Sequence, residues 1–116
     1  MKVFIVHAHH ESKSFNGALT EAAIAALTAN GHGTCVSDLY AMGFDPVSDR
    51  QNFTTPADGD YLKQQGEEAH ATAHGGFATD IKAELEKLDW CDVLIFQFPI
   101  WWFGLPVILK RMRKYY

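Results

Sequence analysis

Apolar residues gather in three short runs along the chain, and each run predicts a β-strand. The first, Lys2–His7, is rich in β-branched side chains, and the second, Gly33–Leu39, is a shorter run of the same kind. The third, Val93–Phe98, is almost unbroken, which is typical of a strand buried on both faces of a parallel sheet. Pro99 ends this strand because proline has no backbone N–H to donate.

Helical periodicity fills the segment between the first two predicted strands. The polar stretch Ala8–Ser14 separates the first strand from this pattern, and we expect the helix to begin at Phe15. Ser14 can cap its N-terminus through the side-chain oxygen, and Gly31 suits the left-handed position after its C-terminus. The apolar residues that set the period are Leu19, Ala22, Ala23, Ala26 and Leu27.

A long segment of weak pattern runs from Tyr40 to Gly76. Prolines, glycines and mixed acids and amides dominate it, and Tyr61–His74 is its candidate helix. We interpret the charged and imidazole side chains of that helix as a solvated face. These residues are Glu67, Glu68, His70 and His74.

Two more helices are predicted in the last third of the chain. Thr79 or Asp80 is the expected cap of the first, which leads into the third strand. The second, Leu105–Tyr116, is entered through Pro106 and closes with four cations, which suit a helix C-terminus.

The order of these elements predicts a doubly wound, parallel α/β sheet. A strand, a helix and a strand in quick succession require a right-handed crossover, which makes the two strands parallel. The next crossover places the third strand on the other side of the first, so the expected strand order is 2-1-3. Open α/β sheets bind ligands where the strand order reverses, at the carboxyl ends of the strands. The loops 9–16 and 99–104 should therefore lie side by side.

Those two loops would form a crevice with unlike walls. The start of the helix offers the free N–H groups of residues 15–17, which suit a phosphate. The aromatic residues 101–103 offer flat faces, which suit a planar ring. A phosphate joined to a planar ring indicates a nucleotide or a flavin. The alternative is that these aromatic side chains pack in a core or a dimer interface, and the residues alone leave both interpretations open.

Composition limits the classes of protein and partner. With 116 residues, of which 47% are hydrophobic, the chain has room for one domain with a core. A net charge of −4 argues against nucleic acid as a partner. Cys35 and Cys91 are expected to be reduced thiols in the cytoplasm. The apolar run after Lys2 is too short for a signal peptide or a membrane span.

Histidines around the end of the first strand invite a metal or a phosphate interpretation. Strand alternation would place His7 and His9 on one face and His10 on the other, and no nearby cysteine or carboxylate set completes a shell, so we predict no metal site. His9 is a candidate phosphate partner, with a surface-loop histidine as the alternative. Without a G-x-G-x-x-G motif, Asp38 is interpreted as a turn residue rather than a ribose ligand.

Several motifs follow the order found in one enzyme family and span nearly the whole chain. They are His7-Ala8-His9, Lys13-Ser14-Phe15-Asn16, Ser37-Asp38-Leu39-Tyr40-Ala41-Met42 with Phe44 and Pro46, Asp80-Ile81, and residues 95–106 with Ile108-Leu109-Lys110. In this ordered set the sequence resembles the flavin-dependent NAD(P)H:quinone oxidoreductases, the diaphorase-like branch of the flavodoxin-like fold, which also includes drug-modulator and potassium-efflux ancillary reductases.

The resemblance implies a fold and an activity. Residues 1–116 would be a single flavodoxin-like domain, the N-terminal part of a longer doubly wound sheet. The implied cofactor is FAD, with FMN as the alternative, and NAD(P)H is the implied co-substrate. The implied reaction is a two-electron ping-pong transfer of a hydride from NAD(P)H, through the flavin, to a quinone. A homodimer is also implied, because in this family the second protomer completes the cofactor slot.

The resemblance also assigns site residues position by position. The flavin phosphates and ribityl chain would be held by His9, Ser14, Phe15 and Asn16. The isoalloxazine ring would be contacted by Pro99, Ile100, Trp101, Trp102 and Phe103. Of these, Trp102 and Phe103 would also form the wall of the slot for nicotinamide and quinone. No side chain is predicted to be catalytic, because the flavin carries the hydride.

The sequence departs from the family after Lys110. The family continues with two more strands, a Gly-rich loop and a Tyr/His pair at the flavin, whereas this sequence reads residues 111–116 and stops. The strand Val93–Phe98 would then form a hydrophobic sheet edge that needs a partner. Two alternative hypotheses follow: a truncated, catalytically inactive flavin-binding relative, and a flavodoxin-like electron carrier.

Overall fold

The computed structural model describes residues 1–44, 52–54, 57, 59–60, 62–101 and 104–113. The chain divides into two compact units, Met1–Pro46 with Leu85–Tyr116 and Val47–Glu84. The first unit contains the β-sheet, and the second contains the helix α2 (Gln64–His74). The candidate site is built entirely within the first unit.

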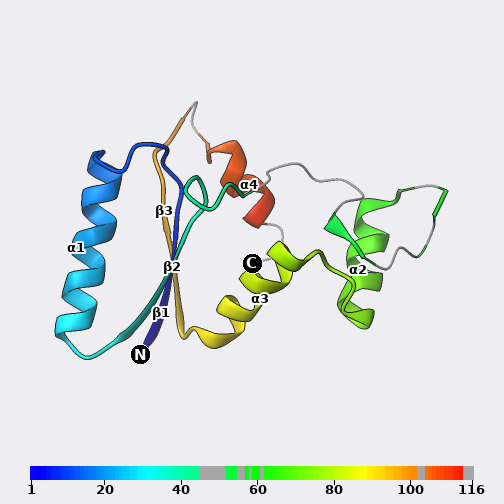
Figure 1. Ribbon diagram of the computed structural model, residues 1–116, viewed down its shortest axis with the longest axis horizontal. Coiled ribbons are helices and arrows are strands. Elements are labelled where there is room, and N and C mark those ends of the chain that lie inside the picture. Colours follow the sequence, from blue (N-terminus) through cyan, green and yellow to red (C-terminus); the bar gives the residue numbers. More distant parts are fainter. Residues whose placement is uncertain (45–51, 55–56, 58, 61, 102–103, 114–116) are drawn as a thin grey trace. The chain divides into compact units, whose positions relative to one another are not determined.

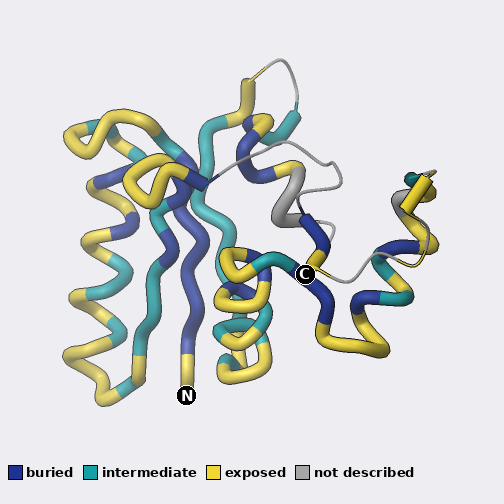
Figure 2. Tube along the Cα trace, turned by 45° about the vertical axis from the view of Figure 1, so that its right-hand side comes forward, coloured by how far each residue is buried: buried dark blue, intermediate teal, exposed yellow. Residues whose placement is uncertain are grey.

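Three parallel strands form the sheet of the first unit. They are β1 (Lys2–His7), β2 (Gly33–Asp38) and β3 (Val93–Gln97), in the order β2-β1-β3 (Figure 1). The order and the parallel pairing confirm the prediction, and β2 ends one residue before its predicted end. The central position of β1 explains why its residues from Val3 onward are buried (Figure 2).

Alternation along β1 divides its side chains between two layers. Val3, Ile5 and His7 lie on the face covered by α1 (Phe15–Ala29), as the hydrogen bond between His7 and this helix shows. The other face enters the main hydrophobic core together with α4 (Val107–Arg113). The buried residues of that core are Phe4, Val6, Ala8, Leu39, Phe44, Ile108 and Leu109. Helices on both faces are what a doubly wound sheet requires.

The predicted ends of α1 are confirmed. Ser14 is the N-cap, and its hydroxyl accepts a hydrogen bond from the N–H of Gly17 at 3.1 Å. Asn30 is the C-cap, and Gly31 follows it at φ 78°, a left-handed conformation in which a side chain would be strained. The cap matters for function because it fixes where the N-terminus of α1 lies relative to β1.

The third strand is less buried than its sequence predicted. Val93 is 37% exposed, and residues 94–97 are half-buried rather than buried on both faces. The reason is position: among the described strands β3 pairs only with β1, so it is an edge strand. The apolar run identified a strand correctly, but a run alone does not tell a central strand from an edge strand.

Helix boundaries differ from the prediction by one or two residues. α3 (Thr79–Trp90) already includes Thr79 and Asp80, so neither is the cap, although the Asp80 carboxylate accepts the N–H of Ile81 at 2.9 Å. α4 begins at Val107 rather than Leu105, and the carbonyl of Pro106 accepts hydrogen bonds from the N–H groups of the first helical turn. Residues 114–116 of the predicted final helix lie outside the described residues.

The second unit corrects one interpretation of its polar residues. Glu67 on α2 is 2% exposed, and its carboxylate accepts a hydrogen bond from the N–H of Ala57 at 2.9 Å, so it does not belong to a solvated face. The rings of His70 and His74 stack with centroids 4.2 Å apart. The helix spans Gln64–His74, while Tyr61, the predicted start, lies outside the described residues.

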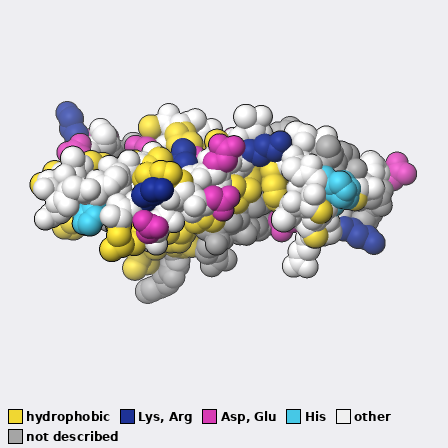
Figure 3. Space-filling model, turned by 90° about the horizontal axis from the view of Figure 1, so that it is seen from below, with side chains coloured by type: hydrophobic (Ala, Val, Ile, Leu, Met, Phe, Trp, Pro, Cys, Tyr) yellow, Lys and Arg dark blue, Asp and Glu magenta, His cyan; other side chains and the backbone are white. Residues whose placement is uncertain are grey.

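Two surface properties bear on partners. On the face drawn in Figure 3, Lys and Arg side chains lie among Asp and Glu instead of forming a basic stripe. Across the described part of the chain, no helix has the length and apolar content needed to cross a bilayer.

Cys35 and Cys91 are free, half-buried thiols that pack against the main core.

Candidate functional site

The carboxyl ends of the three strands meet at one level of the sheet. His7, the last residue of β1, is in register with Asp38 of β2 and with Gln97 of β3. Beyond this level the N–H of Ala8 still donates to the Gln97 carbonyl, and the N–H of Leu39 to the His7 carbonyl, both at 3.0 Å. The loops that follow all three strands therefore leave the sheet together, as the predicted ligand crevice requires.

A side-chain hydrogen bond joins the two walls of this crevice, the start of α1 and the end of β3. Gln97, at the end of β3, donates from Nε2 to Oδ1 of Asn16, in the first turn of α1, at 2.8 Å. Both groups are partly buried, so the bond is shielded from competing water. It holds the N-terminus of α1 beside the end of β3.

The N-terminus of α1 offers two free donors rather than the three predicted. The N–H of Gly17 is used by the Ser14 cap, so it is not free. The N–H groups of Phe15 and Asn16 have no acceptor among the described residues, and the first turn of α1 carries no acidic side chain. The partial positive charge of the helix end is therefore not neutralised by the helix itself, which favours an anionic ligand.

Gly17 also allows a close approach of two backbones. A β-carbon at this position would overlap the carbonyl oxygen of Ser12. Glycine therefore lets the loop that carries His9 and Ser12 pack tightly against the first turn of α1.

The hydrogen bonding of His9 identifies which of its ring nitrogens can donate to a ligand. The N–H of Glu11 donates to Nδ1 of His9 at 3.0 Å. Nδ1 is thus an acceptor and carries no proton, which leaves the proton of the neutral ring on Nε2. An Nε2–H group on the loop that leads into a helix N-terminus is suited to donate to a phosphate oxygen.

Aromatic rings from all three loops gather next to His9. The rings of His9 and Trp101 are tilted, with centroids 6.0 Å apart, and His10 lies 5.8 Å from Trp101 and 5.9 Å from Tyr40. A cavity of about 330 Å³ opens here, lined among others by His9, His10 and Tyr40. The predicted meeting of the first-strand and third-strand loops is therefore present in the structure.

The same cluster corrects the expected placement of the histidines. The rings of His9 and His10 stack with centroids 4.6 Å apart and planes 15° from parallel, instead of pointing to opposite faces. Alternation fails here because β1 ends at His7, and beyond it the loop turns both rings the same way. Among the described residues, no group of His, Cys, Asp and Glu is arranged to hold a metal ion.

Only part of the predicted aromatic wall is described. Pro99 is half-buried, Ile100 is 72% exposed and Trp101 is 38% exposed. Trp101 and Gly104 exchange backbone hydrogen bonds at 3.1 and 3.2 Å. Trp102 and Phe103, the predicted flavin and substrate contacts, lie outside the described residues.

Two residues of the cluster were given no role from the sequence. Tyr40 sits two residues after the end of β2, within the motif shared with the family, and the register of the strand ends brings it beside His10. The position of Tyr40 after a strand was the available signal, because aromatic side chains at the carboxyl ends of parallel strands face the ligand edge. His10 carried no comparable signal, since its contacts depend on how the loop bends.

The described residues fit a flavin. Phe15 and Asn16 supply free N–H donors, and His9 supplies a third at Nε2, all suited to phosphate oxygens. The exposed face of Trp101 supplies an aromatic surface at the other bank of the crevice. Ser14 contributes through its cap, which orients these N–H groups, rather than through a free hydroxyl.

Comparison with known proteins places this architecture in a family. A family model described as "Flavodoxin-like fold" matches residues 1–112. The rat protein "NAD(P)H dehydrogenase [quinone] 1" is 44% identical over 110 residues, which cover 94% of this chain and 40% of the relative. The human "Ribosyldihydronicotinamide dehydrogenase [quinone]" is 42% identical over 110 residues, which cover 94% of this chain and 48% of the relative.

Solved structures agree with the sequence comparison. A Klebsiella pneumoniae protein described as a quinone reductase superposes with a TM-score of 0.91 at 44% identity, covering 96% of this chain and 43% of that chain. The NAD(P)H:quinone oxidoreductase from Methanothermobacter marburgensis gives a TM-score of 0.78 at 29% identity, and the match covers 98% of this chain and 51% of that chain. The chain thus spans about half, or less, of the length of the relatives it matches. The strand order, the crevice at its reversal point and a match over residues 1–112 show that this chain belongs to the flavodoxin-like fold family.

Proposed function

We propose that the protein is an NAD(P)H:quinone oxidoreductase that binds FAD, with FMN as the alternative flavin. The proposal rests on the names of its relatives and on one geometric observation, the 6.0 Å separation of the His9 and Trp101 rings. Because these two rings lie close together, the phosphate donors and the aromatic wall belong to a single crevice. When bound, the flavin supplies two-electron hydride chemistry between NAD(P)H and a quinone.

The residues of the chain have distinct proposed roles toward the flavin. His9, Phe15 and Asn16 donate hydrogen bonds to its phosphates, and Ser14 holds the helix end in place. Pro99, Ile100 and Trp101 line the ring with Trp102 and Phe103, and the last two also face the nicotinamide and quinone. Gln97 keeps the two banks at a fixed separation through its bond to Asn16.

Reconstitution with FAD or FMN, followed by a steady-state assay, tests this function. We expect flavin absorbance that stays with the protein after desalting, and oxidation of NADH or NADPH by a simple quinone well above the rate of free flavin. The control is an equal concentration of free flavin with an unrelated protein. A chain that retains neither flavin would contradict the proposal.

A second candidate is a flavin-binding segment without turnover of its own, because the chain covers only 40% and 48% of two curated relatives. The same assay separates the two: retained flavin with no quinone-dependent oxidation of NADH or NADPH supports this candidate. Bound flavin that dithionite reduces, but NADH and NADPH do not, supports an electron carrier instead.

We further propose a homodimer that works in the cytoplasm, with residues 1–116 belonging to one flavodoxin-like domain. β3 offers a half-buried apolar edge with no second neighbour among the described strands, which favours association. The single chain has a mass of 13.0 kDa, and light scattering of the flavin-loaded protein should give twice that mass. A monomer at the concentration of the activity assay would count against the dimer.

A further inference from the structure

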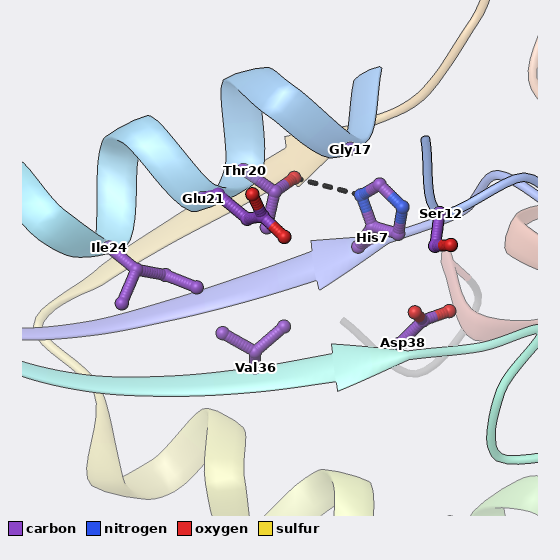
Figure 4. Close-up of a pocket in the computed structure, with 8 residues that line it drawn as sticks. All are labelled: His7, Ser12, Gly17, Thr20, Glu21, Ile24, Val36 and Asp38. Carbon is purple, nitrogen blue, oxygen red and sulfur yellow. Dashed lines mark hydrogen bonds between the residues drawn. The ribbon is translucent and has the colours of Figure 1, made fainter. Parts of the chain in front are cut away.

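A second cavity lies next to the first and shares Ser12 and Asp38 with it. It measures about 200 Å³ and is bounded by α1 and by the strands β1 and β2 (Figure 4). Polar groups line one end of it and aliphatic side chains the other. The lining residues that matter here are His7, Ser12, Asp38, Glu21, Ile24 and Val36.

His7 is the buried polar group of this cavity. Its side chain is only 4% exposed, and its Nδ1 lies 2.8 Å from the hydroxyl of Thr20. The other ring nitrogen, Nε2, has no partner among the described residues, and Figure 4 shows it turned away from Thr20 toward Ser12 and Asp38. A histidine that is hydrogen-bonded at one ring nitrogen can still form a hydrogen bond to a ligand in the cavity through the other.

Charge decides the class of ligand. Asp38 and Glu21 both line the cavity, from β2 and α1, and none of the described lining residues is Lys or Arg. One oxygen of Asp38 accepts the N–H of Ala41 at 3.2 Å, which anchors the carboxylate while its other oxygen remains available. Two carboxylates without a cation disfavour an anionic ligand and favour a cation.

The aliphatic end of the cavity indicates the shape of the ligand. Ile24 and Val36 offer apolar surface at the end of the cavity away from Asp38, as Figure 4 shows. A short alkyl chain would bury its carbon atoms there, while an ammonium group at the other end donates to the carboxylates.

We infer that this cavity is a binding site for a short primary alkylammonium ion. The ammonium group donates to Asp38, to Glu21 and to Nε2 of His7, and the Nδ1–H of His7 then donates to the Thr20 hydroxyl. The site adjoins the proposed flavin crevice, because Ser12 and Asp38 line both cavities, but it includes neither Trp101 nor any part of β3. Its other lining residues come from β1, β2 and α1.

Nuclear magnetic resonance of the flavin-free and flavin-loaded protein, with propylammonium chloride as the probe, tests the site. We expect saturable shifts of the His7 ring signals and ¹⁵N shifts that report a proton on Nδ1 and an unprotonated Nε2. Asp38→Asn and Glu21→Gln should each weaken binding about fivefold, since each removes one partly screened charge and keeps the shape. Asn at position 38 also keeps the oxygen that accepts the Ala41 N–H.

The matched control is Glu86→Gln, an exposed acid on α3 that does not line the cavity, which should leave the affinity unchanged. Glycerol and propionate probe neutral and anionic ligands of similar size, and neither should saturate. No saturable shift with propylammonium, equal binding of glycerol or propionate, or unchanged affinity in both acid variants would each overturn the inference. Because binding is read without turnover, failure here is distinguishable from failure of the quinone reductase assay.

Discussion

Replacing His9 by alanine should weaken flavin binding by about 10- to 100-fold. The loss follows from the hydrogen bond that Nε2–H of His9 is proposed to donate to a flavin phosphate, since a hydrogen bond to a charged group contributes about 1.5–3 kcal/mol. The dissociation constant is measured by quenching of flavin fluorescence on titration with the protein. His9→Gln, which keeps an N–H donor at similar reach, should recover part of the affinity.

The control for this variant is His32→Ala. His32 lies at the opposite end of the sheet, where its Nδ1 is 2.9 Å from the terminal amine of Met1, and its replacement should leave flavin affinity unchanged. If His9→Ala binds flavin as tightly as the unaltered protein, His9 is the ordinary loop histidine of the alternative interpretation. The Trp101 contact would then need another explanation.

Replacing Phe4 by alanine should lower the free energy of unfolding by about 3–5 kcal/mol. Phe4 is fully buried on the central strand, in the core that also contains Val6 and Leu109, so its removal costs both apolar burial and a cavity. The loss is a large fraction of the about 5–15 kcal/mol typical of a folded protein. Urea denaturation followed by circular dichroism measures it.

Phe15→Ala is the control, because it removes an exposed phenyl ring instead of a buried one. Phe15 is 77% exposed at the first position of α1, so its loss should change the free energy of unfolding by less than about 0.5 kcal/mol. Flavin affinity should also be retained, because alanine keeps the backbone N–H that Phe15 is proposed to donate to a flavin phosphate. A Phe4→Ala protein as stable as Phe15→Ala would show that the core around β1 is loosely packed.

Prediction from the sequence succeeded where a single element carries its own signal. β-branched runs located all three strands, Ser14 and Gly31 located both ends of α1, and the order of elements gave the strand order 2-1-3. Prediction failed where a residue depends on neighbours distant in sequence. Glu67 is charged and lies on a polar helix, yet it is buried, because Ala57 supplies a donor that no helical period reveals.

The sequence by itself determined which residues form the sheet, which loops leave its ligand-binding edge, and hence where a phosphate and a planar ring could bind. These features follow from hydrophobic period, capping chemistry and chain connectivity, all of which act over short stretches. Tertiary structure alone decided that His9 presents Nε2, that His10 and Tyr40 join Trp101, that Gln97 fixes Asn16, and that His7 faces a second cavity. Those outcomes depend on how loops bend and on which side chains meet across the sheet, and such contacts leave no periodic trace in the order of residues.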